Sequence, residues 1–196
     1  MKITSYMLLA GMLMISMAEA GENTMNDRIQ ALMSELKVEP ASDHEVSARS
    51  QGALSIQKLK TMDNLSVRHK TQGEGEGGTT SEKLLFSGAN GKIKAVGKVE
   101  YKKSARAAQK ALFKRLAQNS LPLEILLKRY EIAEGPGDIC IVEKIFDKAT
   151  GRFVVDGSQV HFIRGNVAVT VRSEDEGVNT KELARQMDQV LVEGNE

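Results

Sequence analysis

A loop of Gly165 and Asn166 constrains the fold more than any other feature of this chain, because alternating apolar residues flank it on both sides. A Gly-Asn pair suits the two-residue loop of a β-hairpin, which needs positive φ angles. This loop pairs His161 with Thr170 and places alternate residues on one face. We predict that this face is the core; its residues are Val160, Phe162, Val167, Val169 and Val171. A shift of one residue would turn the whole set towards water, so the register is well specified.

Asp156-Gly157 is a second pair that suits a hairpin loop, and it predicts another hairpin just before the first. In that hairpin Phe153 joins the core face, whereas Arg152 faces His161 on the opposite side. Both turns then agree on which residues are buried.

Periodic apolar residues predict the remaining elements of the compact region. A weak strand is expected near residues 65–69, a hairpin around Asn90-Gly91, and a strand at 138–146. Helices are expected after Ser104, over 121–130, and after Asn179. We predict an α+β fold, an antiparallel sheet with helices packed on one face.

A stretch rich in Gly and Glu at residues 72–81 has little to bury, and it predicts a mobile boundary. The predicted division is a signal peptide at 1–20, an amphipathic helix with a flexible linker at 21–80, and a compact α+β domain at 81–196. The helix spans 26–37, and its apolar stripe contains Ile29, Leu32, Met33 and Leu36.

The first 20 residues have the build of a secretory signal peptide. Lys2 supplies a positive charge, an apolar run of 12 residues follows at 6–17, and the small residues Ala18 and Ala20 precede Gly21. The run is shorter than the roughly 20 residues that a membrane-spanning helix needs. We expect cleavage after Ala20, a periplasmic or extracellular protein, and no stable membrane anchor; an uncleaved anchor is the alternative.

Composition narrows the classes of partner. The chain has 27 basic and 26 acidic residues, a balance that gives no strong field for nucleic acid. Cys140 is the single cysteine, so no intramolecular disulfide can form. With no Trp and few other aromatic residues, the chain also lacks the stacking platforms typical of sugar and single-strand nucleic-acid binding.

No motif predicts a catalytic or metal site. The three histidines show no zinc-ligand spacing, so we expect no metal and no cofactor. Cys140 would be a nucleophile if a neighbouring histidine lowered its pKa, but its apolar flanks are typical of a buried side chain. We therefore name no catalytic residue.

Four residues are candidates for contact with a ligand or partner. Arg152, His161 and Thr170 are expected to form a polar patch on the sheet face away from the core, if that face is open. Arg164 lies at a hairpin tip, where an ion pair with Asp156 or Glu174 is the first interpretation and a ligand contact the second.

The last 60 or so residues resemble the C-terminal unit of several bacterial secreted proteins and extracellular sensor-type domains. The resemblance rests on Gly137-Asp138, on the segment 160–169, and on Leu183-Ala184 and Asp188 in the last helix. It implies the α+β fold and carries no ligand or catalytic residue.

Our leading hypothesis is an exported, non-catalytic protein that binds an envelope protein or a small ligand. One alternative is an exported hydrolase whose site no motif reveals. Another is an adaptor that docks through the stripe of the first helix, with the stretch at 72–81 as a tether. A deep pocket with a histidine beside a carboxylate or Cys140 would favour the enzyme, and a detached first helix would favour the adaptor.

Overall fold

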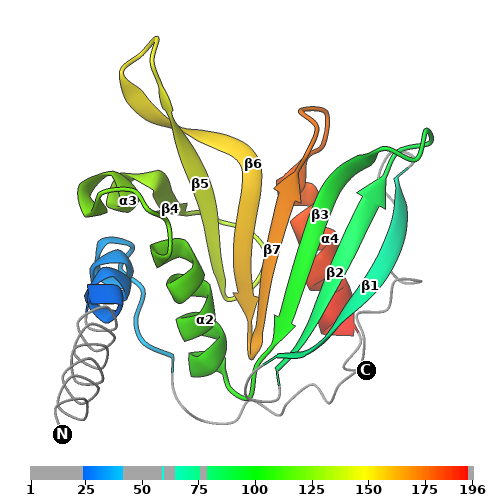
Figure 1. The fold of residues 1–196 in the computed structure, drawn as a ribbon, viewed down its shortest axis with the longest axis horizontal. Helices are drawn as coiled ribbons and strands as arrows, with labels where there is room; N and C mark the ends of the chain where they lie inside the picture. The colour runs from blue at the N-terminus through cyan, green and yellow to red at the C-terminus, as the bar shows by residue number, and fades with distance from the viewer. Residues whose placement is uncertain (1–23, 42–58, 60–64, 76–78, 194–196) are drawn as a thin grey trace, which may run out of the picture.

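The computed structural model describes residues 24–41, 59, 65–75 and 79–193 (Figure 1). A first helix covers residues 24–35. The elements that follow are β1 (Ser66–Gly75), β2 (Thr79–Ser87), β3 (Ile93–Tyr101), α2 (Ala105–Ala117), α3 (Leu123–Arg129), β4 (Tyr130–Ile132), β5 (Ile139–Asp147), β6 (Arg152–Arg164), β7 (Val167–Ser173) and α4 (Thr180–Glu193). The signal peptide expected at 1–20 lies outside the described residues.

The strands form one seven-stranded antiparallel sheet in the order β1-β2-β3-β7-β6-β5-β4. It consists of two meanders, β1 to β3 and β4 to β7, that join where β3 pairs with β7. The α+β class and the antiparallel sheet are confirmed. Among the described helices, none is long and apolar enough to cross a bilayer.

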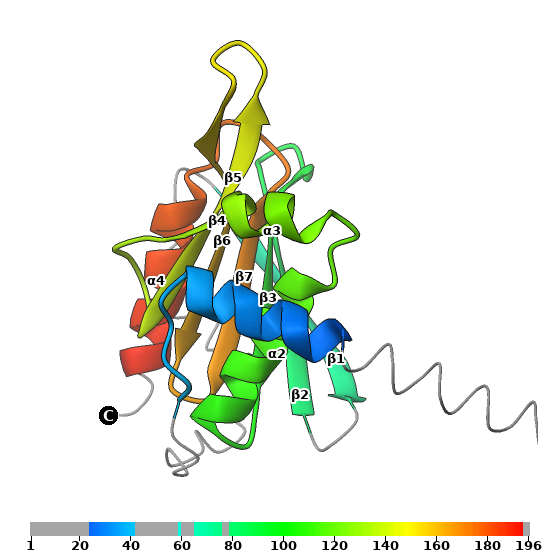
Figure 2. The same cartoon turned by 90° about the vertical axis from the view of Figure 1, so that its left-hand side faces the viewer.

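Helices cover both faces of the sheet, and this corrects the expectation that all of them pack on one face (Figure 2). On one face, α4 packs against the cluster that contains Phe162 and Val169. On the other, α2 and the helix at 24–35 pack against Ile141 and Ile163. Both faces of the central strands are therefore apolar, as is usual for strands that are covered twice.

The predicted register of the β6–β7 hairpin is confirmed at every position. His161 pairs with Thr170, and Arg164 pairs with Val167 across the loop. The residues predicted for the core face all belong to the cluster under α4; they are Val160, Phe162, Val167, Val169 and Val171. Ser104 also caps α2 as predicted, because its hydroxyl accepts a hydrogen bond from the Ala107 amide at 3.1 Å.

The second hairpin, predicted at Asp156-Gly157, is wrong. β6 runs without a reversal from Arg152 to Arg164 and pairs with β5 at residues 152–155 and again at 160–163, with a register shift between the two stretches. Gly157 has the positive φ of 71° expected of a turn residue, but it bends the strand and does not reverse it. Phe153 therefore faces Phe146, and Arg152 faces Asp147.

The compact region begins before the predicted boundary at residue 81. β1 pairs with β2 and reaches Gly75, inside the stretch expected to be a linker. The first helix is not detached either, because Ile29, Leu32 and Met33 are buried against α2 and α3. The apolar stripe that an adaptor would use to bind a partner is thus buried within the fold.

Candidate functional site

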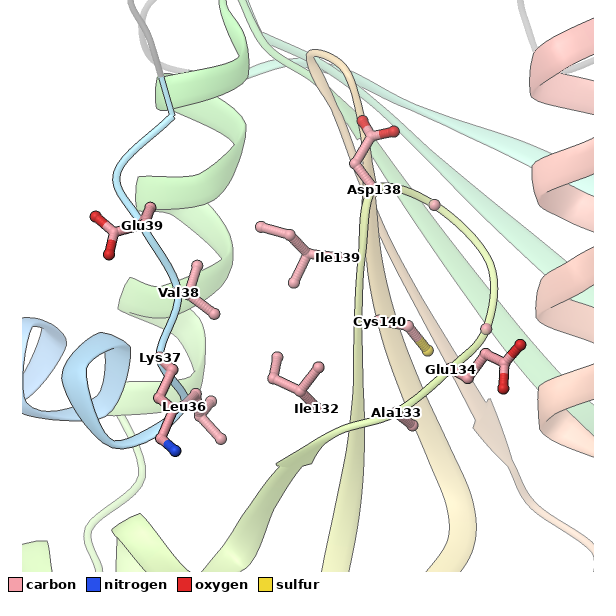
Figure 3. Close-up of a pocket in the computed structure, with 12 residues that line it drawn as sticks. Leu36, Lys37, Val38, Glu39, Ile132, Ala133, Glu134, Asp138, Ile139 and Cys140 are labelled. Carbon is pink, nitrogen blue, oxygen red and sulfur yellow. The ribbon is translucent and has the colours of Figure 1, made fainter.

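A cleft lies between the segment that follows the first helix and the strands β4 and β5 (Figure 3). Its volume is about 520 Å³, within the range of roughly 300–1,000 Å³ usual for ligand pockets. Val38, Ile132 and Ile139 point into it, whereas Glu134 and Asp138 lie at its margin. Its other lining residues are Leu36, Lys37, Glu39, Ala133, Gly135, Gly137 and Cys140. Apolar side chains point into the cleft and charged side chains lie at its rim, so the exposed lining is mixed and more polar than apolar.

One wall of the cleft is the chain that leaves the first helix. Lys37 has a φ of 53°, and the Val38 amide donates to the Met33 carbonyl at 2.9 Å, which ends the helix and turns the chain. Buried Gln109 of α2 then holds this chain in place. Its Nε2 donates to the Glu39 carbonyl at 2.8 Å, and its Oε1 accepts from the Ala41 amide at 2.8 Å. Because both ends of the buried amide are satisfied, the wall is fixed to α2.

The opposite wall is the end of β4, the start of β5 and the loop between them. The Ala133 amide donates to the Cys140 carbonyl at 3.0 Å, and the Asp138 amide donates to the Ile163 carbonyl at 2.6 Å. Between them, Gly137 has a φ of 78°, and a Cβ on it would lie 2.4 Å from the Ile163 carbonyl oxygen. Only glycine fits there, so the loop has one well-defined path.

An ion-pair cluster fastens this loop to the rest of the domain. Arg164 donates from Nε and Nη2 to the two oxygens of Asp188, at 2.8 and 2.6 Å, and from Nη1 to Asp138 at 2.9 Å. The two carboxylates also accept from backbone amides: Asp188 from Gly137 at 2.9 Å, and Asp138 from Gly165 at 2.7 Å. The hydrogen bonds to Asp188 raise the pKa of the Arg164 guanidinium. The guanidinium therefore stays charged, and the cluster ties the loop before β5 to β6 and α4.

This cluster gives Arg164 an ion-pair role, as the first interpretation expected, but its partners are Asp138 and Asp188. The predicted partners do not contact it: Asp156 accepts a hydrogen bond from Ser158, and Glu174 pairs with Arg172. Asp138, Arg164 and Asp188, three polar residues of the segments that carry the resemblance, each have a hydrogen bond in this cluster. The cluster supports the cleft from one side.

Cys140 lines the cleft but lacks the features of a nucleophile. Burial raises the pKa of its thiol, although Lys181 and Arg185 oppose the shift, so the reactive thiolate is disfavoured. The described lining of the cleft includes no histidine. The pocket with a histidine beside Cys140 that would favour an enzyme is not formed here.

His161 and Thr170 lie together but in a buried network, so the expected open polar patch is wrong. His161 is 1% exposed, because α2 covers this face. Its Nδ1 lies 2.9 Å from the Thr170 hydroxyl, and its Nε2 lies 2.9 Å from the Gln159 side-chain amide. Arg115 of α2 donates to the same Thr170 hydroxyl at 2.6 Å and also binds Glu100.

The buried network keeps His161 neutral. Burial lowers the pKa of His161 to about 3, and the nearby positive charge of Arg115 acts in the same direction. The Gln159 amide donates to Nε2, so the ring proton sits on Nδ1 and is donated to Thr170. A neutral ring with both nitrogens engaged has a structural role here.

Arg152 lies far from this network, at the exposed beginning of β6. Of the four predicted contact residues, the structure thus brings together only His161 and Thr170. No sequence signal indicated the apolar residues of the cleft, because they come from two segments far apart in the chain, residues 36–39 and 132–140. Within the described residues, no group of His, Cys, Asp and Glu is arranged to hold a metal ion.

Comparison with protein-family models, with curated proteins and with solved structures finds no match to this chain.

Proposed function

We propose that this chain is an exported, non-catalytic binding protein that holds a small ligand with both apolar and polar groups in the cleft between residues 36–39 and β4–β5. The cleft is the observation that carries the proposal, since its walls are fixed and apolar side chains point into it between polar groups at the rim. Carboxylates at its rim favour a neutral or positively charged head group over an anion. Export rests on the composition of residues 1–20 and predicts a mature chain that begins at Gly21, which N-terminal sequencing of exported protein would test.

A hydrolase has less support from the described residues. Cys140 and His161 belong to opposite faces of the sheet, since Cys140 pairs with Phe162, the residue next to His161. A nucleophile and a base must lie within hydrogen-bond reach of each other. Binding without chemistry is the simpler use of this cleft.

The test is a titration of the mature chain with the neutral apolar probe N-phenyl-1-naphthylamine, whose fluorescence rises in apolar sites. We expect saturable binding that Val38→Trp weakens by at least about tenfold, because the indole fills the cleft. Val192→Trp is the matched control, since Val192 is 49% exposed near the end of α4. Equal binding by the two variants, or no saturable binding by the parent chain, would contradict the proposal.

A further inference from the structure

The hairpin of β5 and β6 extends beyond the body of the domain. We call residues 144–155 the β5–β6 arm (Figures 1 and 2). Four large apolar side chains on it are exposed: Ile145 by 45%, Phe146 by 54%, Val154 by 40% and Val155 by 52%. A concentration of exposed apolar residues on a projecting element is typical of an interaction surface.

The β5–β6 arm is apolar on both of its faces. Ile145 pairs with Val154 on one face, and Phe146 pairs with Phe153 on the other, with ring centroids 5.5 Å apart. Asp147 closes the turn, because its carboxylate accepts hydrogen bonds from the Ala149 amide at 2.9 Å and from the Thr150 hydroxyl at 2.6 Å. A two-stranded ribbon of this kind is only marginally stable alone in water, so covering it would stabilise it.

One backbone edge of the arm is open. β7 pairs with β6 only over residues 159–164, and no described strand lies along the same edge of β6 at residues 152–156. Unpaired backbone groups on such an edge can bind another strand. The arm thus offers both apolar side chains and hydrogen-bonding groups.

The sequence along this edge is complementary to itself. The segment is Arg152-Phe153-Val154-Val155-Asp156. When two copies pair antiparallel about Val154, the first residue of one copy lies opposite the last residue of the partner. Arg152 of each copy then faces Asp156 of the partner, an opposite-charge pair that occurs twice. Phe153 likewise faces the partner's Val155, and Val154 faces itself on the twofold axis.

The charges at the two ends are available for such pairing. Both Arg152 and Asp156 are exposed. Arg152 has no ion pair among the described residues, and Asp156 accepts a hydrogen bond only from the hydroxyl of nearby Ser158. Pairing with a second copy therefore breaks no ion pair of Arg152 or Asp156 among the described residues.

An acidic hollow at the base of the arm adds to this complementarity. It has a volume of about 400 Å³, and its lining includes the carboxylates of Asp156, Glu174, Asp175 and Glu176. In the antiparallel pairing, the tip of the partner's arm runs past Asp156 towards this hollow. That tip carries the exposed side chain of Lys148, whose charge suits the hollow.

We propose that the β5–β6 arm pairs with the same arm of a second copy, through the open edge of β6, to form a twofold symmetric dimer. The second copy is preferred to another partner because the edge matches its own charges in antiparallel register. The dimer brings Phe153 of each copy against the partner's Val155 and pairs the open backbone edges, and it leaves the cleft between residues 36–39 and β4–β5 accessible.

Charge reversal tests the register without altering buried residues. Arg152→Asp places Asp opposite Asp156, and Asp156→Arg places Arg opposite Arg152, so each variant should dissociate at least about tenfold more readily than the parent. An equimolar mixture of the two variants restores opposite charges at both ends and should dimerise, and the doubly reversed chain should dimerise as well. Sedimentation equilibrium of the mature parent and variant chains measures the dimer dissociation constants. Circular dichroism confirms that the variants fold.

Several outcomes would overturn the proposal. A parent chain that stays monomeric at all concentrations would do so, as would two single variants that remain monomeric when mixed while the parent dimerises. Vesicles of anionic phosphatidylglycerol test the alternative occupant. A monomeric chain that sediments with them, and loses this on Phe146→Ser, would assign the arm to a membrane surface instead.

Discussion

The two halves of β6 differ in environment although both are rich in apolar residues. At residues 160–163 the strand is buried, with α4 on one face and α2 on the other. At residues 152–155 it carries the exposed Val154 and Val155, and β5 is the one strand beside it among the described residues. The change occurs at Gly157, where the strand bends.

This contrast shows that an apolar strand does not decide its own burial. The β-branched and aromatic residues of both halves favour an extended chain equally. Burial depends on helices that come from distant parts of the sequence, and those helices end below the arm (Figure 1). The body is therefore stable within one chain, whereas the arm gains most from a second chain.

The largest expected effect separates the two halves by one type of substitution. Phe162→Asp buries a carboxylate where Phe162 is 0% exposed, so we expect it to cost at least about 4 kcal/mol and to prevent folding. Phe153→Asp on the arm should cost about 1 kcal/mol, mainly from the lost ring contact with Phe146. Urea unfolding of both variants checks this, under conditions that keep the chain monomeric. Similar losses would mean that the arm is part of the core.

Glycine positions give a second contrast. Gly137→Ala places a methyl group 2.4 Å from the Ile163 carbonyl oxygen at a positive φ, and we expect a loss of about 3 kcal/mol. Gly157→Ala at the base of the arm has a similar φ but no atom within 4 Å, so strain alone should cost about 1 kcal/mol. Thermal unfolding ranks the two variants. A larger loss at Gly157 would show that the bend is held more tightly than we infer.

The smallest effect is a pH dependence that belongs to the body. His161 has its folded pKa lowered to about 3, whereas in the unfolded chain it titrates near about 6.5. Between these values the unfolded chain binds a proton that the folded chain does not. Stability from this residue is therefore full above about pH 6.5 and falls with pH by up to about 1.4 kcal/mol per pH unit.

Variants of one residue in each region test this pH dependence. His161→Gln should flatten the change in urea midpoint between about pH 6.5 and 4, even though it also lowers stability overall. Asp147 at the tip of the arm is partly exposed, and its hydrogen bond with Thr150 lowers its pKa below the usual value. Asp147→Asn should leave the slope close to that of the parent chain. An unchanged slope in His161→Gln would show that the ring is protonated in the fold.

Local sequence signals predicted the β6–β7 hairpin correctly because its loop and both alternating flanks agree. They failed at Asp156-Gly157, where the turn signal competes with a second turn at 149–151. After that earlier turn, β5 is long enough to pair with both residues 152–155 and residues 160–163, so β6 continues along this one partner and does not turn back. The loop signal at Gly157 therefore produced a bend.

The coverage of both sheet faces by helices was predictable from the apolar residues of the central strands. Residues 139–142, 160–163 and 167–169 are almost continuously apolar, which is typical of strands covered on both faces. His161 led to the wrong prediction, because a polar side chain among these apolar residues favours a position that faces solvent. The cleft had no comparable signal, because Val38, Ile132 and Ile139 meet only after the chain has folded.

The junction between β3 and β7 has a consequence for the rate of folding. Each meander is assembled from neighbours in the chain, so its hairpins can form on a timescale of about microseconds. Their junction pairs Ala95 with Ser173 and Tyr101 with Val167, residues far apart in sequence, and α2, α3 and the second meander lie between them. Closing that long loop is entropically costly before any contact rewards it. We expect the two halves of the sheet to form early and their union to limit the rate.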